Sequence, residues 1–111
     1  MNLTFEMQNS IGIIAIEGEL DASSATEFDQ FFQKHAKETN NFVLDLEKVD
    51  FIDSTGLGRI IAALRHLSEA DGDIRLCGIN KKIMLVFQIT RAHRIFDIYD
   101  EKAEAIKSFA E

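Results

Sequence analysis

The chain has 111 residues, of which 46% are hydrophobic, and its formal net charge is −7 at pH 7. This length and this apolar content suit one domain with an ordinary core. The acidic balance excludes nucleic acid and anionic membrane as main partners, because both select basic surfaces. No apolar run is long enough to cross a membrane and the first residues do not resemble a signal peptide, so we expect a cytoplasmic protein.

The hydrophobic pattern predicts alternating strands and helices in the order ββαβαβαβα. Alternating or continuous apolar runs indicate strands, and apolar residues three and four positions apart indicate helices. The expected strands are residues 3–8, 11–17, 42–46, 74–77 and 95–99, and the expected helices are residues 22–38, 57–67, 81–89 and 101–109. This order predicts an α/β fold in a single domain, 1–111, with a mixed, mainly parallel β-sheet and helices packed against it.

Several local expectations follow from this pattern. Asn9 and Ser10 suit a tight turn, so the first two strands should form a hairpin. Asp21 is a good N-cap for the first helix. The single cysteine, Cys77, lies in an apolar strand and should be a buried thiol, and no disulfide or cysteine-based metal site can form within the chain. Met84 and Leu85 fall outside the inward face of the third helix and should be exposed.

The sequence "FIDSTGLGRI" at residues 51–60 is the candidate for function. It joins a strand to a helix, which is where open α/β sheets usually bind ligands and partners. Asp53 or Ser54 can cap the helix. Each glycine in a helix costs about 1 kcal/mol relative to alanine, so Gly56 and Gly58 need a reason. We interpret them as bare positions where a partner backbone or a phosphate can approach closely.

Enzyme motifs do not fit these residues. A nucleophile elbow needs glycine two residues before the serine, where this chain has Ile52. The three histidines, His35, His66 and His93, have no spacing that brings one to Ser54. Ile61 replaces the small residue that a dinucleotide fingerprint requires, and no metal-ligand spacing occurs. The residues alone leave open a plain capped turn, a nucleotide-binding module and a protein-docking site; we expect no catalysis and no cofactor.

The combination of "GELDASSA", "FVLDLEKV" and "FIDSTGLGRIIAAL" resembles the STAS domains of bacterial anti-sigma factor antagonists. The resemblance covers the element order of the whole chain and implies the same α/β fold. In that family the serine directly after the aspartate is phosphorylated, and here that residue is Ser54, with Thr55 as the rival acceptor. One difference is Arg91, where many relatives have a glycine at the end of the third helix.

The resemblance also implies partners and a mechanism. The unphosphorylated antagonist binds an anti-sigma factor, which is itself a serine kinase, and so releases the sigma factor; phosphorylation prevents this binding, and a serine phosphatase is expected to reverse it. A STAS module with a partner outside sigma-factor control is the alternative. The expected partner-binding residues are Asp21, Asp53, Ser54, Thr55, Gly56, Leu57 and Gly58.

Overall fold

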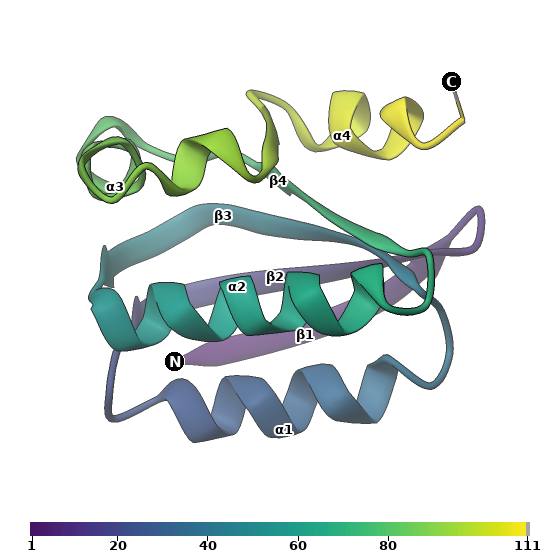
Figure 1. Cartoon of the computed structure of the whole chain (residues 1–111), viewed down its shortest axis with the longest axis horizontal. Coiled ribbons are helices and arrows are strands. Elements are labelled where there is room, and N and C mark those ends of the chain that lie inside the picture. Colours follow the sequence, from purple (N-terminus) through teal and green to yellow (C-terminus); the bar gives the residue numbers. More distant parts are fainter. Residues whose placement is uncertain (111) are drawn as a thin grey trace.

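A computed structural model describes residues 1–110. Five strands form one sheet in the order β1-β2-β3-β4-β5, with β1 antiparallel to β2 and every other pair parallel (Figure 1). The predicted α/β fold and the predicted element order are confirmed. The strands are β1 (Asn2–Gln8), β2 (Ile11–Leu20), β3 (Asn41–Ile52), β4 (Asp73–Cys77) and β5 (Asp97–Tyr99), and the helices are α1 (Ala25–His35), α2 (Ser54–Ser68), α3 (Lys81–Ile89), η1 (Ala92–Arg94) and α4 (Lys102–Ser108).

The β1–β2 hairpin forms as the sequence predicts. Gln8 lies opposite Ile11, so Asn9 and Ser10 are the two residues of the turn. Both have positive φ, at 54° and 67°. Two successive residues with positive φ are the signature of the type I′ turn, whose twist matches that of antiparallel strands.

The two faces of the sheet are covered unequally. Alternate strand residues such as Ile14, Phe42 and Leu44 point to one face, where they pack with α1, α2 and α3 in the larger core. The intervening residues Ile13 and Val43 point to the other face, where α4 provides a smaller cover. Figure 1 shows α1 and α2 on one side of the strands and α4 on the other. The opposite face is therefore only partly covered.

Several predicted boundaries are wrong, and the largest error is in the third strand, which extends to Ile52 instead of ending at residue 46. The first helix covers Ala25–His35 instead of 22–38, because residues 21–24 form a separate turn before it. The last strand covers only Asp97–Tyr99, because the chain first makes a short 3₁₀ helix and Ile95 donates its N–H to the Ala92 carbonyl at 3.1 Å. The final helix covers Lys102–Ser108 instead of 101–109, because Glu101 is its N-cap.

Arg91 keeps the backbone turn that a glycine would make after α3. Its φ is 63° and its ψ is 14°, which is the left-handed conformation. An L-residue other than glycine adopts this conformation at a cost of roughly 1–2 kcal/mol. The sequence difference at this position therefore leaves the local turn in place.

Candidate functional site

The start of α2 presents two free hydroxyls. Asp53, the residue between β3 and α2, is the N-cap, and its Oδ1 accepts a hydrogen bond from the Gly56 N–H at 2.8 Å. Ser54 and Thr55 occupy the first helical positions and both are exposed. No hydrogen bond within residues 1–110 involves either hydroxyl. The capping role thus belongs to Asp53 alone, and the Ser54 hydroxyl is available to a reagent from solvent.

The sheet brings the two sequence motifs together. Leu20 and Ile52 are neighbours across the parallel β2–β3 pair, so the chain leaves both strands at the same edge. The Ala22 N–H donates to Asp53 Oδ2 at 3.2 Å, while the other oxygen of this carboxylate caps α2. One aspartate thus connects the loop before α1 with the start of α2. This connection brings the loop that contains Asp21 beside the turn that contains Ser54.

Asp21 orders its own loop instead of capping α1. Its Oδ1 accepts from the Ser23 hydroxyl at 2.6 Å, from the Ser23 N–H at 2.9 Å and from the Ser24 N–H at 3.2 Å. The predicted N-cap role is wrong, because these local bonds hold residues 21–24 in a turn and α1 begins after it. The Ser23 hydroxyl, followed by the backbone N–H groups, lowers the pKa of Asp21, so its carboxylate stays ionised.

Gly56 has a structural reason that sequence reasoning missed. A Cβ at Gly56 would lie 2.0 Å from the Leu20 carbonyl oxygen, so α2 packs directly on the end of β2 only because this side chain is absent. Gly56 is itself buried. The interpretation of Gly56 as a bare surface position is therefore wrong. At Gly58 a Cβ would meet nothing within 4 Å, and this residue is exposed, so the open position is Gly58 alone.

Leu57 is a core residue. Its side chain is 3% exposed and belongs to the same cluster as Ile60 and Leu67 on the inward face of α2. Its expected contact with a partner is wrong for the side chain, because the spacing of α2 points this position at the sheet. The surface residues of the proposed site are therefore Asp21, Asp53, Ser54, Thr55 and Gly58.

Phe51 extends this surface in a way the sequence analysis did not identify. It is 41% exposed, while the next residue, Ile52, is buried. The Lys82 ammonium lies 6.0 Å from the Phe51 ring centroid and donates to the Asp50 carbonyl at 2.9 Å. The register between β2 and β3 shifts beside this residue, and Asp50 and Phe51 are exposed in succession, so strict alternation would not have predicted the exposed ring.

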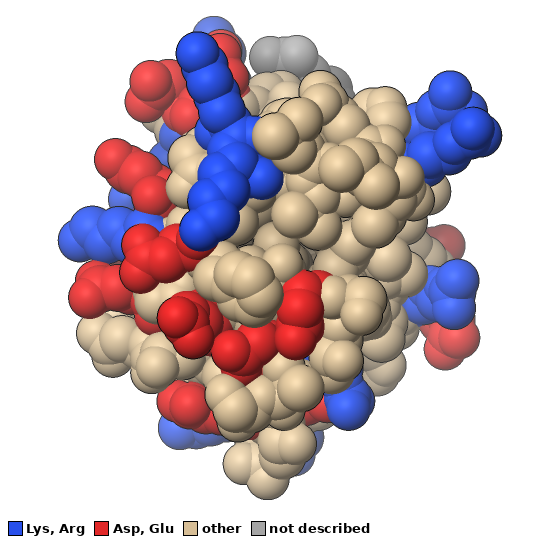
Figure 2. Space-filling model, turned by 90° about the vertical axis from the view of Figure 1, so that its left-hand side faces the viewer, with Lys and Arg blue, Asp and Glu red and all other residues tan. Residues whose placement is uncertain are grey.

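The outer face of α3 is also partly apolar. Leu85 is 56% exposed and Ile89 is 80% exposed. The exposure expected for Leu85 is confirmed, whereas Met84 is half-buried against the core. Figure 2 shows the end of the molecule where α1 and α2 begin: acidic side chains lie near the middle, with a broad uncharged area above them and to the right. This end therefore presents a surface that is partly apolar and partly acidic.

The three histidine side chains contact residues outside the turn that contains Ser54. His35 stacks on Phe5 with 3.8 Å between ring centroids, and His66 meets the Phe32 ring edge-on. His93 places Nδ1 3.2 Å from the Phe87 carbonyl. In the part of the chain that the structure describes, none of them contacts the serine, so no nucleophile–base pair is assembled there.

Known proteins match this chain over nearly its whole length. The STAS domain family model matches residues 2–105. The "Anti-sigma F factor antagonist" of Paenibacillus polymyxa is 28% identical over 96% of this chain and 94% of its own length. The "Anti-sigma-B factor antagonist" of Staphylococcus aureus is 30% identical over 81% of this chain and 86% of its own length.

A solved structure agrees with these sequence matches. The structure of a candidate anti-sigma factor antagonist from Thermotoga maritima superposes with a TM-score of 0.93 at 28% identity, covering 98% of this chain and 95% of that one. Fold and family model agree: the chain belongs to the STAS domain family.

Proposed function

We propose that this protein is an anti-sigma factor antagonist whose binding is switched off by phosphorylation of Ser54. The observation that carries the proposal is the exposed Ser54 hydroxyl, which has no hydrogen-bond partner in residues 1–110 and begins α2 directly after the capping aspartate. The relatives from Paenibacillus and Staphylococcus are named as antagonists acting on different sigma-factor systems. The antagonist role is therefore what these relatives share, while the sigma factor differs among them.

In this proposal the partner is an anti-sigma factor with serine kinase activity, and a serine phosphatase restores the active form. Binding releases the sigma factor. Because sigma factors act in the cytoplasm, the proposal also implies that this protein is cytoplasmic. The docking surface consists of Asp21, Asp53, Ser54, Thr55 and Gly58. Phe51 adds an exposed aromatic ring beside them, and aromatic residues are enriched at the energetic centres of interfaces.

A phosphate on Ser54 would act at the interface and leave the fold intact. It adds about −1.5 to −2 charges at neutral pH. The Ser54 side chain is exposed, and the unpaired N–H groups at the start of α2 stabilise a nearby negative charge. The carboxylates of Asp53 and Asp21 lie on the same surface, however, so a docked partner would bury several negative charges together. Without matched cations this costs several kcal/mol, and each 1.4 kcal/mol is tenfold in affinity.

Binding of the purified kinase partner to three variants tests the proposal. Ser54→Ala should bind like the wild type and resist phosphorylation, and Ser54→Asp should bind at least tenfold more weakly while unfolding at the same urea concentration. Thr55→Ala is the matched control, because it removes the neighbouring exposed hydroxyl and should still be phosphorylated. Phosphorylation of Ser54→Ala at Thr55, or full binding by Ser54→Asp, would contradict the proposal.

A further inference from the structure

The two edges of the sheet differ in length and cover. Because the strand order begins with β1 and ends with β5, each of these strands has one side without a neighbouring strand. β5 covers only Asp97–Tyr99 and packs against η1 and α4. β1 covers seven residues, Asn2–Gln8, and pairs with β2 in one continuous register without a bulge. Long, regular edge strands are the ones that pair with a further strand, so β1 is the edge suited to this.

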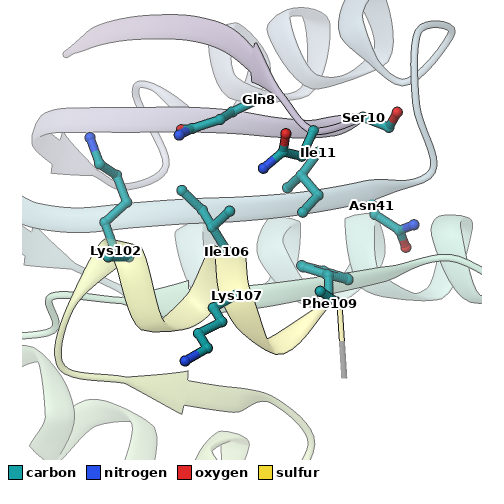
Figure 3. Close-up of a pocket in the computed structure, with 11 residues that line it drawn as sticks. Gln8, Ser10, Ile11, Asn41, Lys102, Ile106, Lys107 and Phe109 are labelled. Carbon is teal, nitrogen blue, oxygen red and sulfur yellow. The ribbon is translucent and has the colours of Figure 1, made fainter.

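The outer side of β1 has free backbone groups. In an antiparallel pair, the N–H and C=O groups of alternate residues face away from the partner strand. Within residues 1–110, no backbone hydrogen bond outside the β1–β2 pair involves residues 2–8. Helix α4 packs against β3, β4 and β5, and Figure 3 shows the strand that leads to Gln8 as the outermost one. β1 also contains no lysine, arginine or proline, the residues that commonly block pairing at an edge.

The apolar side chains of β1 are incompletely covered. Leu3 and Phe5 lie opposite Ile16 and Ile14 of β2, on the face that carries the larger core. The two isoleucines are buried, whereas Leu3 and Phe5 are only half-buried, and Met7 on the same face is 44% exposed. The core therefore ends at this edge with apolar surface still in contact with water. A strand added here would remove that surface from water if it placed apolar residues on the same face.

We propose that β1 pairs with β1 of a second copy of this chain, antiparallel about a two-fold axis at Phe5. The strand, NLTFEMQ, is complementary to itself in this register. Leu3 lies opposite Met7 of the second copy and Phe5 opposite Phe5, so apolar residues meet on the core face. Glu6, the one charged residue of the strand, lies opposite Thr4. The two sheets become one continuous sheet, and the free backbone groups of both edges form hydrogen bonds.

Other registers are less favourable. An axis at Glu6 places the two carboxylates directly opposite each other, and like charges in that position destabilise a strand pair. An axis at Thr4 leaves Met7 and Gln8 with no opposite residue in the second β1. The axis at Phe5 pairs all seven residues of the strand. It also brings together the two Phe5 rings, each of which stacks on His35 with 3.8 Å between ring centroids.

Sedimentation equilibrium and amide hydrogen exchange of the full chain test the pairing. Between about 10 µM and about 1 mM protein, the average mass should rise toward twice that of the monomer. Over the same range, amide exchange should slow at alternate residues of Asn2–Gln8 and stay unchanged at Asp97–Tyr99, the other edge of the sheet. A monomer at every concentration, or a dimer whose exchange slows only outside β1, would overturn the proposal.

Charged substitutions at exposed positions of β1 test the register. Thr4→Lys places an ammonium opposite Glu6 of the second copy, twice by symmetry, and should lower the dimer Kd about fivefold, the equivalent of about 0.5 kcal/mol for each pair. Thr4→Glu places like charges there and should raise the Kd by a similar factor. Asn2→Lys is the matched control for net charge: it faces Gln8 and should change the Kd less than about twofold. Equal effects of Thr4→Lys and Thr4→Glu, or a larger gain from Asn2→Lys than from Thr4→Lys, would refute the axis at Phe5.

Discussion

Alanine substitutions at the two glycines of α2 should have opposite effects on stability. Both positions lie in the first turns of the same helix, and alanine is favoured over glycine by about 1 kcal/mol at an unobstructed helical position. At Gly58 a Cβ would meet nothing within 4 Å, so Gly58→Ala should stabilise the protein by about that amount. At Gly56 the same propensity gain is present, but a collision opposes it.

The collision at Gly56 is with backbone. The added Cβ would lie 2.0 Å from the Leu20 carbonyl oxygen and 2.7 Å from its carbon, and ordinary contact begins near 3.4 Å, so the atoms must separate by about 1.4 Å (3.4 − 2.0). Neither the end of β2 nor the start of α2 can yield like a flexible side chain, because Asp53 joins the two through its bonds to Ala22 and Gly56. Overpacking costs typically 1–3 kcal/mol, and the upper value applies here. The net loss for Gly56→Ala is about 2 kcal/mol.

Urea unfolding followed by circular dichroism measures both effects. With a denaturant slope of about 1–3 kcal/mol/M, the difference of ~3 kcal/mol between the variants should separate their midpoints by about 1 M or more. The slopes should be equal, because neither variant changes the surface exposed on unfolding. Equal stability of Gly56→Ala and wild type would refute the close-packing explanation, and a destabilised Gly58→Ala would refute the open position.

Gly58→Ala also separates stability from binding. Its added methyl group projects from the proposed docking surface, so the variant should be more stable than the wild type and bind the kinase partner more weakly. Unchanged binding would remove Gly58 from the docking surface and leave the stability argument as it stands.

Three further predictions concern single side chains. Because the pKa of Asp21 is lowered, its carboxylate stabilises the fold above the ordinary pKa of 3.8, and this contribution disappears as the pH falls through the pKa of the folded state. Ser23→Ala should raise the pKa of Asp21 measured by NMR titration, and an unchanged pKa would contradict the assigned cause. Burial, followed by the charge of Asp45, raises the pKa of Cys77 to about 12, so the native thiol should react with a disulfide reagent at pH 8 far more slowly than in urea; equal rates would contradict the buried thiol. Ser10→Gly should stabilise the type I′ turn by about 1 kcal/mol in thermal unfolding, because glycine adopts positive φ without strain; a lower melting temperature would count against the turn assignment.

The order of strands and helices could be predicted because each element follows its own hydrophobic period. The hairpin likewise depends on the two turn residues, Asn9 and Ser10, and on the strands beside them. Boundaries failed where local side-chain bonds compete with a helix, as at Asp21, and where a 3₁₀ turn shortened the last strand. These competing bonds depend on exact geometry, which periodicity does not contain.

The sequence by itself determined the fold class, the family resemblance and the position of Ser54 at the start of a helix. Only the tertiary structure decided what the neighbouring residues do. Gly56 is required by a carbonyl 36 positions earlier in the chain, at Leu20, and Leu57 is buried because α2 lies on the sheet. The stacking of Phe5 on His35 likewise joins the first strand to the first helix. Such contacts between distant segments leave no periodic signal, because they arise only when the strands pair and the helices pack.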